Sequence, residues 1–76
     1  MKEILETIIK NLVSDKNAVS INEIEGEKSV TFEVKVASGD MGRIIGRQGR
    51  TANAIRTVAK AVALKEHKKV SIEFIG

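Results

Sequence analysis

Apolar residues near the start of the chain recur in adjacent pairs, one pair every four residues. This spacing puts each pair on the same face of a helix. It therefore predicts an amphipathic helix over residues 4–13 that ends near Ser14 and Asp15. The apolar stripe of this helix consists of Ile4, Leu5, Ile8, Ile9, Leu12 and Val13.

The pattern then changes from helical to alternating. Residues 18–25 are rich in β-branched side chains, and Gly26 follows them as a turn residue. Beyond the turn, apolar and polar positions alternate, which predicts a second strand with one buried face and, with the first, a hairpin. The apolar positions are Val30, Phe32, Val34 and Val36, and the polar positions between them are Thr31, Glu33 and Lys35.

The second half of the chain predicts two helices and a strand. Ser38-Gly39-Asp40 is a candidate N-cap for a short helix over residues 41–45. Helical periodicity returns from Arg50 or Thr51 to about Leu64, and residues 65–68 end that helix with cations that suit the negative end of its dipole. The expected core residues are Ile55, Val58, Ala59 and Val62 of this helix, and Val70, Ile72 and Phe74 of a final strand.

The order αββααβ predicts an α+β fold in which three helices cover a three-stranded sheet. With 76 residues, the chain has room for one domain, residues 1–76. The chain contains no Cys and one His, which excludes disulfides, the usual structural zinc sites and a cysteine nucleophile. No apolar run reaches the roughly 18 residues of a membrane helix, and Glu3 and Glu6 do not suit a signal peptide. A cytoplasmic location is expected.

Charge is distributed unevenly along the chain. Residues 1–38 contain five lysines and seven acids, a net charge of −2, whereas residues 39–76 contain eight cations and three acids, a net charge of +5. The four arginines all lie between residues 43 and 56, and residues 41–65 contain no acid. A concentrated basic patch favours a polyanionic partner, nucleic acid first, although a solvated helix face would look the same by charge alone.

The segment Gly46-Arg47-Gln48-Gly49 lies between the two predicted helices of the basic region. Two glycines three residues apart allow a tight turn with unusual dihedral angles. Free amides at the start of the next helix attract phosphate, and Arg43, Arg47 and Arg50 flank the turn. The preceding apolar pair supplies one core residue and one surface against which bases can lie. These two residues are Ile44 and Ile45, in an order that the sequence leaves open.

In this context the segment resembles the GXXG loop of a KH domain of type II topology, the module that clamps four nucleotides of a single strand. The block from Gly42 to Ala52, GRIIGRQGRTA, and the length and element order of the whole chain resemble the small bacterial single-KH proteins of the KhpA family. Arg47 stands where Lys is more usual in this loop. Because either side chain binds phosphate, this departure changes little.

The resemblance implies an RNA-binding protein rather than an enzyme, with no cofactor, metal or small-molecule substrate. It implies an RNA chaperone or post-transcriptional regulator that forms a homodimer, or a heterodimer with a KhpB-type KH protein, in a system for cell division, elongation and envelope homeostasis. The RNA-binding residues that it implies are Gly42, Arg43, Ile44, Ile45, Gly46, Arg47, Gln48, Gly49 and Arg50.

Plainer interpretations remain open for several of these residues. Gly46 and Gly49 also suit a simple turn between helices with a glycine cap, although that turn needs only one glycine. Gly42 is either a close packing point or part of the RNA groove. Arg56 and Lys60 are expected to form a solvated stripe, and His67 an exposed helix end without a catalytic role.

The long helix is apolar over a wider arc than one sheet would cover. We therefore expect Ala54, Ala61 and Leu64 to border a protein interface, unless the alanines merely favour helix formation. An adaptor that keeps the KH shape and works mainly through this helical face is the alternative function. A nucleotide-hydrolysing P-loop is excluded, because its lysine is missing and the glycine spacing differs.

Overall fold

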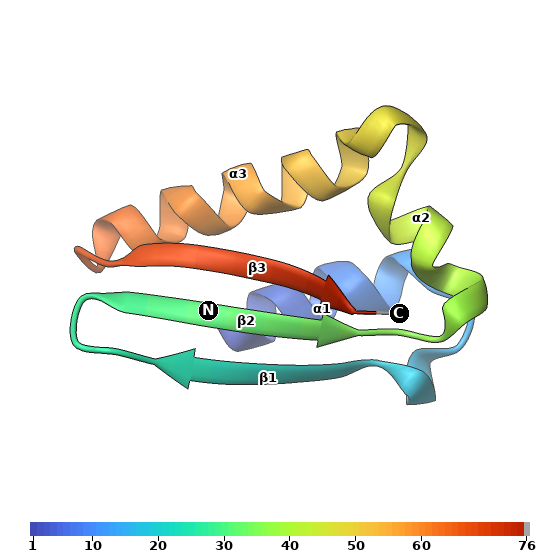
Figure 1. Cartoon of the computed structure of the whole chain (residues 1–76), viewed down its shortest axis with the longest axis horizontal. Coiled ribbons are helices and arrows are strands. Elements are labelled where there is room, and N and C mark those ends of the chain that lie inside the picture. Colours follow the sequence, from blue (N-terminus) through green and yellow to red (C-terminus); the bar gives the residue numbers. More distant parts are fainter. Residues whose placement is uncertain (76) are drawn as a thin grey trace.

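The computed structural model describes residues 1–75, and its elements follow the order αββααβ (Figure 1). The predicted α+β fold is confirmed, and its element order is the one that the resemblance to a type II KH domain implies. The helices are α1 (Lys2–Leu12), α2 (Met41–Ile45) and α3 (Arg50–Lys65), and the strands are β1 (Ser20–Glu25), β2 (Ser29–Lys35) and β3 (Lys69–Ile75). Short 3₁₀ turns occupy Lys16–Ala18, Ser38–Asp40 and Arg47–Gly49.

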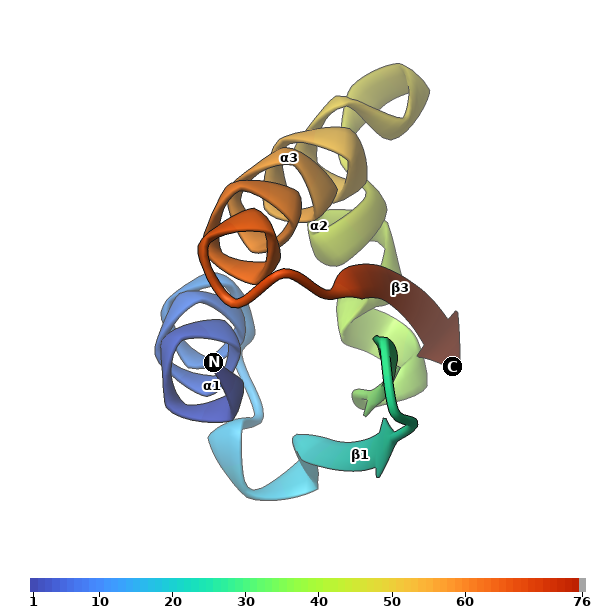
Figure 2. The ribbon, with the colours of Figure 1, turned by 90° about the vertical axis from the view of Figure 1, so that its left-hand side faces the viewer.

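The three strands form one mixed sheet in the order β1-β2-β3. β1 is antiparallel to β2, as expected for a hairpin, whereas β2 and β3 are parallel. A parallel pair needs a long crossover, and α2 and α3 provide it. Figure 2 shows α1 and α3 together on one side of the sheet. Because β3 is the last strand in the order, it keeps one free edge, and this edge lies beside α3.

The core lies between the helices and the inward face of the sheet. Alternate residues of β2 are buried, as the sequence predicts, because successive side chains of a strand point to opposite faces. Leu5 and Ile9 of α1 and Ile44 of α2 close this core. α1 ends at Leu12, slightly before the predicted end, because Val13 is already extended. Within residues 1–75 no helix has the length and apolar character needed to cross a bilayer.

The predicted core face of α3 is partly wrong. Val58 was expected to be buried, but its side chain is 44% exposed. α3 instead contacts the core through a line of residues that includes three alanines, which lets the helix lie close to the sheet and turns Val58 outward. The buried residues are Ala52, Ile55, Ala59 and Ala63, while Val62 is half-buried.

The N-cap of α2 is Asp40, within the predicted cluster Ser38-Gly39-Asp40, but its side chain does not cap the helix. Residues 38–40 form a 3₁₀ turn, and α2 has no side-chain cap bond among the described residues. The Asp40 carboxylate is buried and accepts hydrogen bonds from the backbone N–H groups of Ser14 and Asp15, both at 3.0 Å. These two bonds, helped by the charge of Arg43, lower the pKa of Asp40 despite its burial. Asp40 therefore joins the end of α1 to the start of α2.

Replacement of Asp40 by Asn is expected to destabilise the fold in a pH-dependent way. An amide has one acceptor oxygen and no charge, so it cannot hold both backbone amides as the carboxylate does. A Tm loss of more than about 5 °C at pH 7 is expected for a domain of this size. The pKa of Asp40 is lower in the folded state, so its contribution is present above the unfolded pKa of about 3.9 and is lost as the pH falls through the folded value. Thermal unfolding at pH 7, 5 and 3 should show the difference between Asp40→Asn and wild type shrinking below about pH 4. A difference that stays constant to pH 3 would contradict this role.

Candidate functional site

A tight loop joins α2 to α3 at one tip of the molecule (Figure 1). Three of its residues have positive φ: Gly46 at 73°, Gln48 at 57° and Gly49 at 75°. The N–H of Gly46 donates to the carbonyl of Gly42 at 2.9 Å and ends α2, and the N–H of Gly49 donates to the carbonyl of Gly46 at 3.2 Å. The loop is thus closed by its own backbone, with Gln48 at its apex.

Gly46 is the tightest point of this loop. A Cβ atom here would lie 2.2 Å from Oγ1 and 2.7 Å from Cβ of Thr51, which belongs to the first turn of α3. Its φ of 73° with ψ of 177° falls in a region that is essentially restricted to glycine. Gly49 has open space around it and needs glycine only for its left-handed conformation. The conformation of the turn is therefore enough to explain both glycines. The evidence for a function comes from the charged side chains around them.

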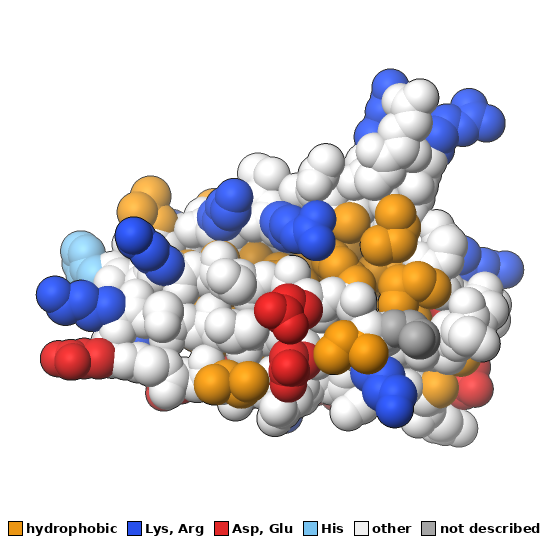
Figure 3. All heavy atoms as spheres, viewed as in Figure 1, with side chains coloured by type: hydrophobic (Ala, Val, Ile, Leu, Met, Phe, Trp, Pro, Cys, Tyr) orange, Lys and Arg blue, Asp and Glu red, His pale blue; other side chains and the backbone are white. Residues whose placement is uncertain are grey.

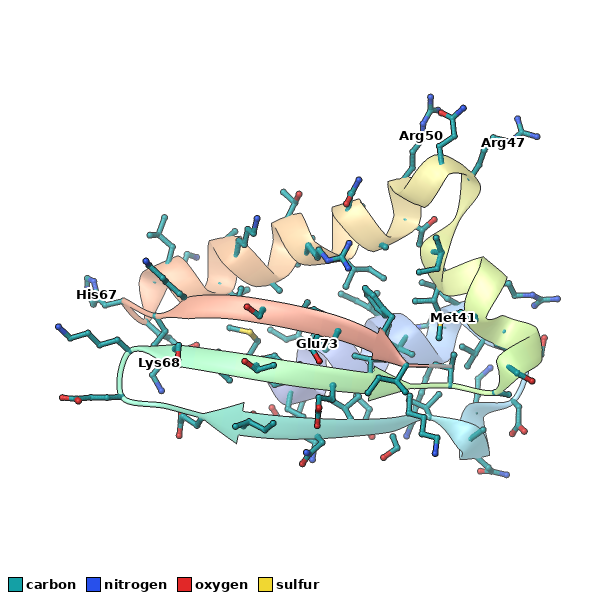
Figure 4. All side chains as sticks on the ribbon, viewed as in Figure 1. Met41, Arg47, Arg50, His67, Lys68 and Glu73 are labelled. Carbon is teal, nitrogen blue, oxygen red and sulfur yellow. The ribbon has the colours of Figure 1, made fainter. Side chains whose placement is uncertain are left out.

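Arg47 and Arg50 project from the tip of the loop, away from the core (Figure 4). Both side chains are exposed, and within residues 1–75 neither forms an ion pair with an acid. They flank the N-terminus of α3, where helix amides and the helix dipole attract anions. Arg43 is exposed on α2, and its charge reaches Asp40 as well as the loop. The three arginines thus lie on α2, on the loop and at the start of α3. Lys and Arg side chains gather at the tip of the molecule (Figure 3).

The structure separates the roles of the two isoleucines before the loop. Ile44 is fully buried in the core, whereas Ile45 is half-buried beside the loop. Ile45 is therefore the residue available to a ligand. For Gly42, a Cβ would meet no atom within 4 Å, so Gly42 is not a close packing point. Of its two interpretations, the surface role remains.

A groove lies between α3 and the free edge of β3, beyond the first turn of α3 from the loop. Arg56, Lys60, Val70, Ser71 and Ile72 line a hollow of about 260 Å³ there. The guanidinium of Arg56 lies 5.2 Å above the ring centre of Phe74, within cation–π range. The free backbone edge of β3 supplies donors and acceptors along the floor of this groove.

Sequence reasoning missed the groove side chains. Phe74 packs against the core, as predicted, but it is only half-buried and its ring lies under Arg56, because β3 is an edge strand. The four-residue spacing of Arg56 and Lys60 showed that they share a face, and their placement opposite β3 required the tertiary fold. His67 is exposed in the turn after α3, with φ of 58°. Within residues 1–75, no group of three or more His, Asp or Glu side chains could hold a metal ion.

The three residues predicted at an interface, Ala54, Ala61 and Leu64, are all exposed. Together with Val58 they are spaced three or four residues apart, so they form one apolar stripe along α3. Leu64, 74% exposed, lies at the end of this stripe that borders Lys60 and β3.

Comparison with known proteins gives consistent matches over nearly the whole chain. The family described as "KhpA/KhpB, KH domain" matches residues 2–74. The "RNA-binding protein KhpA" of Clostridium acetobutylicum is 55% identical over 75 residues, which cover 99% of this chain and 100% of that protein. The protein of the same name from Caldanaerobacter subterraneus subsp. tengcongensis is also 55% identical with the same coverage, and that from Chlamydia trachomatis is 45% identical, covering 99% of this chain and 96% of its own length. No solved structure matches the chain.

Proposed function

Because the chain belongs to the KhpA/KhpB family of KH-domain proteins, we propose that it binds single-stranded RNA through the loop of residues 46–49. The observation that carries this proposal is the glycine turn at the N-terminus of α3, with Arg47 and Arg50 exposed and unpaired by any acid within residues 1–75. The family is non-enzymatic, which confirms the prediction that the chain is not an enzyme.

The proposed mechanism divides the RNA between loop and groove. Phosphates dock at the tip, where the absence of a Cβ at Gly46 and Gly49 keeps the backbone open and Arg47 and Arg50 supply charge. Bases lie against Ile45 and enter the groove between α3 and β3. There they meet the free edge of β3, and Arg56 is held over Phe74 as a flat cation against which a base can stack.

The test is fluorescence anisotropy of a short labelled single-stranded RNA with wild type and with the Arg47→Asp/Gln48→Asp variant at several salt concentrations. If about three phosphates are neutralised, log affinity should fall with log salt at a slope near −2 for wild type. The variant should lose binding, because it places two acids at the phosphate site. Lys16→Asp/Asn17→Asp is the matched control: it makes the same charge change at an exposed turn outside the groove and should retain binding. Equal loss in both variants would assign the effect to net charge and contradict a specific clamp.

The second candidate function is an adaptor that works through α3. The observation in its favour is the exposed stripe of Ala54, Val58 and Ala61, whose small side chains permit close helix approach. Sedimentation of Arg47→Asp/Gln48→Asp separates the two functions, since a loop change should leave a helical interface intact. A variant that self-associates but binds no RNA supports both roles at separate surfaces, and a strict monomer at high protein concentration removes the interface.

The proposal also includes the wider role that the family resemblance implies. We place the protein in the cytoplasm as an RNA chaperone or post-transcriptional regulator that pairs with itself or with a KhpB-type KH protein, in cell division, elongation and envelope homeostasis. Membership of a family described by both names supports the pairing.

A further inference from the structure

The groove beside α3 does not end where the first hollow ends. A second hollow, of about 440 Å³, continues from it, and Lys60, Val70 and Ser71 line both. The residues that only the second hollow contains are Leu64, Lys68 and Lys69, from the last turn of α3 and the start of β3. Its size falls in the range of pockets that hold a small organic molecule.

The second hollow lies beyond the reach of a four-nucleotide clamp if the strand stays stacked. Four stacked nucleotides advance about 14 Å at about 3.4 Å each. Along α3, Lys60 lies about 15 Å and Leu64 about 21 Å from Arg50, at about 1.5 Å per residue. A strand that leaves the loop along the groove therefore arrives at Lys60 with its fifth nucleotide.

The side chains of this hollow combine apolar surface with cations. Leu64 is 74% exposed, more than any other large apolar side chain within residues 1–75, and Val70 lines the same hollow. Lys68 is engaged in an ion pair with Glu25, so its charge is balanced. Lys60 and Lys69 form no ion pair within residues 1–75 and carry the positive charge of the hollow. A flat apolar base with a charged phosphate complements this combination.

We infer that the hollow formed by Lys60, Leu64, Lys69 and Val70 is a second nucleotide subsite that extends the RNA track beyond the loop. Lys60 and Lys69 bind a phosphate, and Leu64 packs against the base of the fifth or sixth nucleotide. This inference rests on the proposed function. It assigns Leu64 to RNA rather than to a protein partner, because Leu64 shares its hollow with the cations Lys60, Lys68 and Lys69.

The experiment is a titration of isotope-labelled protein with single-stranded RNAs of 4, 6, 8 and 10 nucleotides, followed by NMR with RNA in excess so that each strand carries one protein. The four-nucleotide RNA should shift the amide signals of the loop, and the longer RNAs should in addition shift those of Leu64 and Lys69. Affinity should rise at least about tenfold from 4 to 8 nucleotides. Lys69→Gln changes a cation that lines only the second hollow. It should remove most of this gain, keep the four-nucleotide affinity within about twofold, and reduce the salt slope for the longer RNA by about 0.7.

Lys16→Gln is the matched control, because it removes one exposed lysine that does not line the groove. It should keep the gain with length. The inference is overturned if four nucleotides bind as tightly as eight, if the groove variant weakens all lengths equally, or if the gain survives in it. Leu64→Ser that changes self-association and leaves the affinity for eight nucleotides unchanged would assign Leu64 to a protein contact instead. Absence of binding at every length would defeat the proposed function itself, whereas loop binding without a gain defeats only the second subsite.

Discussion

Gly46→Ala is expected to lower both RNA affinity and stability, with a loss of at least about tenfold in affinity. The backbone of Gly46 is in a region that costs other residues about 1–3 kcal/mol. The new Cβ would also lie 2.2 Å from the Thr51 hydroxyl, so either the loop or the first turn of α3 must move. Such movement displaces the helix amides and Arg50, which the proposed phosphate site needs. Thermal unfolding and anisotropy with a short RNA measure the two losses.

Gly39→Ala is the control for this change. Gly39 lies in the turn before α2, has no positive φ and has no atom within 4 Å of an added Cβ. Its replacement should leave RNA affinity unchanged and stability equal or slightly higher, because alanine reduces the entropy of the unfolded chain. Shortening the side chain of Thr51 should not rescue Gly46→Ala, since the backbone conformation is itself unfavourable. Wild-type affinity in Gly46→Ala would show that the loop does not need its observed geometry.

The order of elements followed from the sequence because it depends on local periodicity. The alternation around Phe32 and the paired residues of α1 each bury one face, so the hydrophobic pattern determines both the element and its orientation. The loop was also predictable, since two glycines between helices indicate a tight turn with positive φ, and three arginines beside them indicate an anionic ligand. Local patterns of this kind are sufficient when each element buries one side only.

The features that escaped prediction depend on contacts between distant parts of the chain. Asp40 is a favourable N-cap residue by local rules, but two backbone amides of residues 14 and 15 compete for its carboxylate and prevail. Val58 fits an apolar stripe, yet the alanines beside it allow the closer approach to the sheet. Phe74 follows the apolar alternation of β3 like a core residue, and it is only half-buried because β3 lies at the edge of the sheet. The environment of each of these three residues depends on which helix or strand packs against it in the folded chain.

These contacts have a common functional consequence, because they fix the scaffold and leave the ligand-facing groups free. Asp40 anchors the start of α2, and Ile44 anchors its end in the core. The loop that follows is therefore held on its α2 side, while Arg47 and Arg50 stay in solvent. A rigid backbone with unpaired cations binds phosphate without the entropic cost of ordering the loop.

Ile44→Ala and Ile45→Ala are expected to separate stability from binding. Ile44 is fully buried, and truncation of such a residue typically costs about 2–5 kcal/mol. A domain of 76 residues has a total stability of about 4–11 kcal/mol, so Ile44→Ala loses a large part of it. Ile45 is half-buried beside the loop, so Ile45→Ala should lose less than about 1 kcal/mol and yet bind RNA more weakly, by several fold.

Urea unfolding gives the stability of both variants, and anisotropy at a temperature where both are folded gives their affinity. Folded Ile44→Ala should bind RNA close to wild type if its only role is to anchor α2, whereas Ile45→Ala should show reduced affinity with an unchanged salt slope, because an apolar contact releases no counterions. Equal loss of stability in the two variants would show that Ile45 belongs to the core. Unchanged affinity in Ile45→Ala would remove the base contact from the mechanism and leave the loop as a clamp for phosphates alone.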